Sequence, residues 1–179
     1  MARIQKHVRK TSSENNALKN ITKYKQHIMQ KLIDDEDLCK LLAYQTEDCL
    51  DLETVKESDR YKLINTNIFG YRYVSETAKE AQSYVSMSIS GFVPQEGYRQ
   101  FSDDYLMGYI YFYVLVDTAV MSTNYGYRQD LIASRLQNIF QSSTDLGIGE
   151  IRLEHFVENW EHNNRFGGYI LGFKTVDFK

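Results

Sequence analysis

The order of apolar patterns over residues 83–179 constrains the fold of this chain more than any other sequence feature. Residues 83–92, SYVSMSISGF, alternate apolar side chains with serine, which predicts a strand with one buried and one solvated face. Residues 105–120, YLMGYIYFYVLVDTAV, are a long aromatic and β-branched run, so we expect a strand that is apolar on both faces and is either central in the sheet or covered by partners. After a helical pattern in residues 125–141, the segments 146–157 and 167–179 predict two more strands.

The helical pattern YGYRQDLIASRLQNIFQ has two unlike sides. Its charged side carries Arg128, Asp130 and Arg135, which we expect to face water or a neighbouring subunit. Its apolar stripe, which should cover the sheet, consists of Leu131, Ile132, Leu136, Ile139 and Phe140. The order of elements predicts an α+β fold, an antiparallel or mixed sheet of about four strands with a helix packed on one face.

N-terminal helices should precede this sheet. The capping-box pattern TSSE at residues 11–14 predicts the start of a helix that ends near residue 33. Residues 34–44, DDEDLCKLLAY, predict a second short helix whose carboxylates gather at its start, where the helix dipole favours them. We prefer this interpretation to a calcium site, because the turn glycine and closing glutamate of a calcium loop are missing.

Length and composition indicate one folded domain. The chain has 179 residues, of which 42% are hydrophobic and 25% charged, as in ordinary globular proteins. We expect a basic N-terminal arm over residues 1–12 and a single α+β domain over residues 13–179, with a polar insertion around residues 46–67. No apolar run reaches the roughly 18 residues that a membrane span needs, so we expect a soluble protein without membrane contact. Free thiols at Cys39 and Cys49 fit a reducing cytoplasm.

The formal net charge of -3 is unevenly distributed. Acidic residues crowd residues 34–59, whereas the first ten residues are strongly basic. The candidate contacts of this arm with a partner or with DNA are Arg3, Lys6, Arg9 and Lys10. A frayed, solvated terminus is the alternative interpretation of the same residues.

The sequence offers little catalytic or metal-binding chemistry. It contains no G-x-S-x-G nucleophile elbow, and LGIGE at residues 146–150 follows a helix and precedes a strand, the wrong order for a phosphate loop. Residues 154–164, EHFVENWEHNN, bring His and Glu close in sequence, but we expect them in a strand and an exposed polar loop. We therefore expect no enzyme activity, no metal and no cofactor.

Aromatic residues depart most from average usage, with 14 Tyr and 9 Phe against one Trp. Tyrosine is enriched both in protein interfaces and in strands, and the composition leaves these two explanations open. Trp160 and Phe166 fall in a predicted polar loop, where they either anchor a contact or close over the core. The full set of candidate subunit-interface residues is Tyr127, Arg128, Asp130, Arg135, Trp160, Asn163, Arg165 and Phe166.

The segments NYGYRQDLIASRLQNIF, LGIGEIRL and GGYILGFKTVDF, in this order at the end of a short α+β chain, resemble the neck and tail-terminator (tail-completion) proteins of long-tailed bacteriophages. The resemblance covers roughly residues 83–179. It implies a non-enzymatic subunit of a homo-oligomeric ring, possibly a hexamer, at the head-tail junction. It further implies contacts with connector and tail-tube proteins, passage of DNA through the lumen without sequence-specific binding, and a place in the virion after synthesis in the host cytoplasm.

Two other classes of function remain open on the residues alone. One is a small dimeric regulatory or interaction protein. The other is a small-molecule-binding or enzyme domain with a pocket lined by Tyr109, Tyr111 and Tyr113. A pocket with convergent polar groups would favour the enzyme, and a large surface between subunits would favour assembly.

Overall fold

The computed structural model describes residues 17–73, 81–94, 105–161 and 164–178. Its helices are α1 (Ala17–Asp34), α2 (Glu36–Ala43), α3 (Glu57–Lys62) and α4 (Arg128–Phe140), with a 3-10 turn, η2 (Thr118–Val120). Its strands are β1 (Ile68–Phe69), β2 (Ser83–Pro94), β3 (Tyr105–Asp117), β4 (Ser122–Thr123), β5 (Gly126–Tyr127), β6 (Glu150–Glu161) and β7 (Phe166–Phe178). The helical pattern and the four long strands of the sequence are confirmed, and the capping box at residues 11–14 lies outside the described residues.

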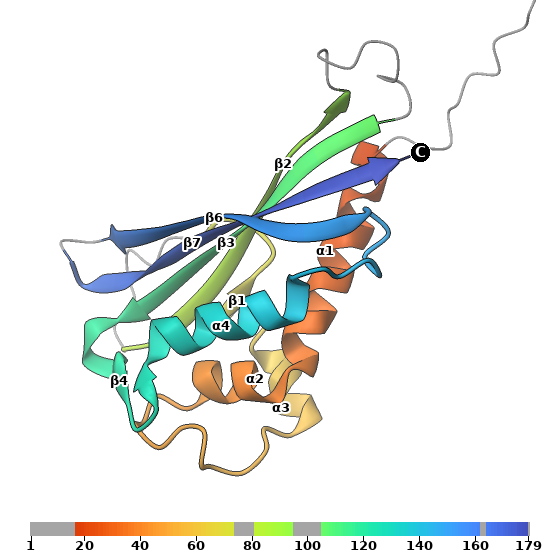
Figure 1. The fold of residues 1–179 in the computed structure, drawn as a ribbon. Helices are drawn as coiled ribbons and strands as arrows, with labels where there is room; N and C mark the ends of the chain where they lie inside the picture. The colour runs from red at the N-terminus through yellow and green to blue at the C-terminus, as the bar shows by residue number, and fades with distance from the viewer. Residues whose placement is uncertain (1–16, 74–80, 95–104, 162–163, 179) are drawn as a thin grey trace, which may run out of the picture.

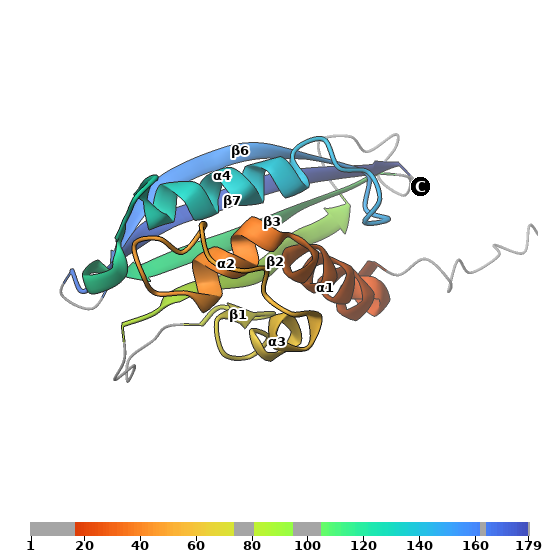
Figure 2. The ribbon, with the colours of Figure 1, turned by 90° about the horizontal axis from the view of Figure 1, so that it is seen from below.

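A five-stranded mixed sheet organises the molecule. Its strand order is β1-β2-β3-β7-β6, in which β1 runs parallel to β2 and the other neighbours are antiparallel. The four helices lie on one face of this sheet (Figures 1 and 2). The predicted α+β class is confirmed, with the short strand β1 as an addition to the four expected strands.

The core lies between the helices and this face of the sheet. Ile110, Phe112 and Val114 of the central strand β3 are fully buried, as the pattern of residues 105–120 predicts. The ring of Phe112 stacks on Phe140 of α4 with 4.7 Å between centroids, and Phe173 of β7 meets Phe112 edge-on. Burial of these large aromatic side chains contributes most of the free energy that stabilises the packing of α4 on the sheet.

A smaller apolar cluster covers one end of the opposite face. It consists of Phe69, Tyr84, Leu115 and Phe166. Because β1 pairs with β2 at this end, Ser86 is 1% exposed and the serine face of β2 is solvated only toward Ser90. The prediction of a uniformly wet serine face was therefore wrong for its first half.

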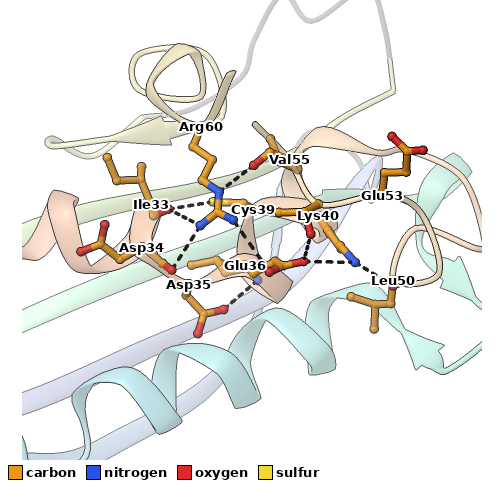
Figure 3. A network of polar contacts seen from close by, with 12 residues as sticks. Ile33, Asp34, Asp35, Glu36, Cys39, Lys40, Leu50, Glu53, Val55 and Arg60 are labelled. Carbon is orange, nitrogen blue, oxygen red and sulfur yellow. Dashed lines mark hydrogen bonds and ion pairs between the residues drawn. The ribbon is translucent and has the colours of Figure 1, made fainter. Parts of the chain in front are cut away.

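The segment between α2 and β1 packs against the first two helices rather than extending from them. Arg60 donates from Nε to the carbonyl of Val55 at 2.8 Å and from Nη1 to the carbonyl of Asp34 at 3.3 Å (Figure 3). Its Nη2 lies 3.9 Å from the Glu36 carboxylate, which also accepts from the Thr54 hydroxyl at 2.6 Å. The segment predicted as a polar insertion thus carries buried side chains of its own, namely Cys49, Val55 and Leu63.

Both cysteines are buried free thiols. Desolvation raises the pKa of Cys39 to about 12, so its thiol stays protonated at neutral pH. Among the described residues, no helix combines the length and apolar character needed to cross a membrane.

Candidate assembly surface

The sheet leaves two edges for further pairing. Strand β6 is the last strand on one side, and over its twelve residues it pairs only with β7 among the described strands. On the other side, among the described strands, β1 pairs only with Val85 and Ser86, and the Asn67 amide donates to the Ser83 carbonyl, so the open edge of β2 begins after Ser86. Unpaired backbone N–H and C=O groups along such edges are ready to accept another strand.

Strand β6 exposes apolar side chains on both faces. Phe156 lies opposite Leu171 and shares the helix-covered face, whereas Val157 lies opposite Ile170 on the other face. Phe156 is 55% exposed, Val157 56% and Trp160 44%. Three exposed large apolar residues within five positions of an edge strand are typical of a protein contact surface.

A groove runs between β6 and α4. We call it the α4–β6 groove, a hollow of about 220 Å³ lined by Asp130, Ala133, Ser134, Gln137, Leu153, Phe156, Tyr169 and Leu171. Phe156 stacks on Tyr169 with 4.5 Å between ring centroids, and the Tyr169 hydroxyl donates to Asp130 at 2.7 Å. This bond to a carboxylate raises the pKa of Tyr169 to about 12, and burial adds to the effect.

Tyrosines form a platform on the sheet face that points away from the helices. Tyr109 and Tyr111 stack with 5.8 Å between centroids, and His155 of β6 lies 5.8 Å from Tyr109. Gly172 of β7 makes room for them, because a Cβ there would come within 2.9 Å of the Tyr111 ring and 3.0 Å of His155. Tyr109, Tyr111 and Tyr113 therefore lie on a sheet face. They line neither the α4–β6 groove nor the hollow beside Arg60.

Arg128 is buried, which contradicts its predicted place on the exposed side of the helix. Its side chain is 0% exposed and donates four hydrogen bonds of 2.7–2.8 Å to backbone carbonyls. The acceptors are the carbonyls of Val120, Leu41, Tyr44 and Thr46. Arg128 thus connects the start of α4 to the end of α2, and this role leaves it unable to contact a neighbouring subunit.

The structure separates the other candidate interface residues by exposure. Tyr127 is 60% exposed, and Asp130 is an exposed residue on the rim of the α4–β6 groove. Arg135 is partly buried and forms an ion pair with Asp35, the residue that caps α2, so much of its charge is used within the chain. Asn163 and the four arm residues Arg3, Lys6, Arg9 and Lys10 lie outside the described residues.

The predicted polar loop at residues 158–166 is shorter than expected. Strand β6 continues to Glu161, so Trp160 lies in a strand, where its indole donates to Glu158 at 2.8 Å. Phe166 is fully buried in the cluster with Tyr84. Of the two predicted roles, a contact anchor or a core residue, the structure shows the core residue. Arg165 remains exposed beside it and donates to Asp117 at 2.9 Å.

The second hollow, of about 490 Å³, lies beside Arg60 between α1 and α3. Its lining mixes the apolar Ile33 and Val55 with charged residues such as Asp34 and Lys56, and Arg60 itself is already bonded to carbonyls. Within the described ranges, no group of three or more His, Cys, Asp or Glu side chains is placed to hold a metal ion.

Sequence reasoning missed Phe156, Val157 and Tyr169 as surface residues. The alternation of Leu153, His155 and Val157 indicates a strand with one apolar face, but an edge position cannot be read from one segment. A register shift between Leu153 and His155 then moves Phe156 onto the helix-covered face.

The comparison with protein families gives the class of the protein. A family model described as YomW matches residues 35–175, which run from the cap of α2 into β7 and leave α1 and the arm outside. The match indicates a phage-associated protein, which is the coarser part of what the resemblance implied. The chain belongs to the YomW family. Neither a curated protein nor a solved structure matches it.

Proposed function

We propose that this protein is a non-enzymatic structural subunit of a phage neck or tail, which assembles into a ring at the head-tail junction and terminates or completes the tail. The observation that carries the proposal is the pair of open sheet edges, β6 and the outer part of β2, in a phage-associated chain. A subunit of a closed ring needs two different complementary surfaces, and these edges supply one on each side.

The strand directions suit head-to-tail addition. Strands β2, β3, β7 and β6 alternate in direction, so β6 runs opposite to β2. A second copy in the same orientation therefore brings its β2 antiparallel to β6, and its helices stay on the same side of the extended sheet. Val157 and Trp160 would be covered by this contact, which explains their exposure in the isolated chain.

The proposed partners follow from the ring. They are further copies of this chain, possibly six in a ring, with connector and tail-tube proteins above and below. The net charge of -3 disfavours tight binding of phosphates, so DNA would pass through the lumen without sequence-specific contact. The proposed location is the virion, after synthesis in the host cytoplasm.

Light scattering behind a sizing column tests the proposal through the mass of the full-length protein. At increasing protein concentration we expect a species whose mass is a fixed multiple of the 21.0 kDa chain and corresponds to a ring. Val157→Lys should abolish this species, because it places a charge in the middle of the β6 edge. The matched control is Asn138→Lys on α4, an exposed position outside both edge strands.

Three results would contradict the proposal. A tight dimer at all concentrations would favour a small regulatory protein. A persistent monomer would remove the support for self-assembly, and an unchanged ring mass in the Val157→Lys variant would show that β6 is not the contact.

A further inference from the structure

The α4–β6 groove is an apolar surface that the described helices leave uncovered. Its floor and walls include Ala133, Leu153, Phe156 and Leu171. Helix α4 packs over β3 and β7, and Phe156 on the adjoining edge strand remains 55% exposed. An apolar groove of this kind, bounded by a helix and a strand, is suited to a peptide with apolar anchors.

Negative charge borders this groove. Asp130 lies on its rim, and Glu158 on β6 is opposite Tyr169 in the register, which places it beside the same ring. Both carboxylates add to the rise in the pKa of Tyr169. In the described part of the chain neither carboxylate forms an ion pair. Asp130 accepts a hydrogen bond from the Tyr169 hydroxyl, and Glu158 accepts one from the Trp160 indole.

The N-terminal arm has the complementary chemistry. Its first twelve residues carry Arg3, Lys6, Arg9 and Lys10 and no carboxylate side chain. They also carry Ile4 and Val8, which are four residues apart and therefore share a face in either a helix or a strand. The arm thus combines apolar anchors with cations, as an apolar groove with an acidic rim requires.

The arm is also long enough to reach the groove. Helix α1 begins at the end of the sheet where β7 ends and β6 begins (Figures 1 and 2). The first apolar anchor, Ile4, is thirteen residues from Ala17, a separation that spans about 44 Å when extended. This exceeds the length of β6, which is about 40 Å for its twelve residues.

We propose that the basic N-terminal arm, residues 1–12, docks in the α4–β6 groove. Ile4 and Val8 contact its apolar floor, and the arm's cations pair with Asp130 and Glu158. The arm comes from the same chain, so the docking requires no ring. The family match begins at residue 35, so the arm lies outside the matched region.

Zero-length carbodiimide cross-linking of the full-length protein, read by mass spectrometry, tests this docking. We expect cross-links from Lys6 or Lys10 to Asp130 or Glu158, in excess over cross-links to exposed carboxylates elsewhere such as Glu57. Ser134→Arg fills the groove and leaves both carboxylates in place, so it should lower the yield about tenfold, which corresponds to about 1.4 kcal/mol. The matched control is Asn138→Arg, an exposed position on the same helix that does not line the groove.

A second variant changes the arm alone. The double substitution Ile4→Ser and Val8→Ser keeps every lysine and should lower the yield of the same cross-links. The proposal is overturned if the arm lysines react equally with Glu57, or if both the groove variant and the arm variant leave the yield unchanged. The cross-links report on the groove within one chain, whereas light scattering reports on assembly. A protein that forms no ring can therefore still show the cross-links, and a ring can form without them.

Discussion

At the scale of single residues, Arg128 carries the connection between the sheet-covering helix and the N-terminal helices. Its guanidinium supplies donors in a fixed planar geometry, and four carbonyls from η2, α2 and the following segment accept from it. Burial lowers the pKa of this guanidinium, yet an arginine stays charged in proteins, so the carbonyl dipoles must balance the desolvation of a full charge.

Replacement of Arg128 by Met should therefore be among the most damaging single changes in the protein. It leaves buried carbonyls without donors, and we expect the free energy of unfolding to fall by about 3–5 kcal/mol. Lys at the same position should recover part of the loss. Urea unfolding measures the effect, with Arg152→Met as control, because the Arg152 side chain is 69% exposed and its loss should cost about 1 kcal/mol or less. Equal costs for the two Met variants would contradict this role.

The hydrogen bond between Tyr169 and Asp130 contributes to the free energy of unfolding, and this contribution is lost at alkaline pH. Its pKa in the folded state, about 12, lies above the value of about 10 for an unfolded tyrosine. The folded state therefore binds the proton more tightly, and this contribution is complete below pH 10 and lost as the pH rises from 10 through 12. We expect the difference in unfolding free energy between the wild type and Tyr169→Phe to be constant up to about pH 9 and to shrink above pH 10. A difference that grows over this range would contradict the assigned bond to Asp130.

At the scale of elements, close approach of two strands depends on one glycine. A Cβ built at Gly168 of β7 would overlap the carbonyl oxygen of Val114 in β3, a backbone atom that cannot move without breaking the pairing. Gly70 offers a comparison, since a Cβ there meets only the Met29 sulfur at 4.0 Å.

We expect Gly168→Ala to destabilise the protein by about 3 kcal/mol, the upper end of what overpacking usually costs. Gly70→Ala should change stability by less than about 1 kcal/mol. Thermal and chemical unfolding of the two variants checks the contrast. Near-native stability of Gly168→Ala would mean that β3 and β7 lie farther apart than described.

The helices and strands themselves were largely predictable, because the spacing of apolar residues along each segment follows the period of a helix or of a strand. The stripe around Leu136 and the alternation around Met87 depend on local geometry and gave the correct elements. Arg128 was not predictable, since its four acceptors come from residues 41–46 and 120, which only the tertiary fold brings together. The exposure of Phe156 likewise depends on strand order and on a register shift, neither of which one segment encodes.

At the scale of the whole molecule, the helices and the sheet edges have separate tasks. The helices bury one sheet face, and Arg128 and Asp35 hold them in place from within the chain. The two edges and the α4–β6 groove remain available for other polypeptide segments. This division fits a subunit whose surface, rather than an enclosed pocket, carries its function.

Electron-microscopy class averages of the assembled fraction of the full-length protein test the central proposal most directly. The account predicts closed rings with one rotational symmetry, in which neighbouring copies add head to tail along β6 and β2 and the helices stay on one side. Particles with only a twofold axis, or single chains at every concentration at which the protein stays dissolved, would contradict it.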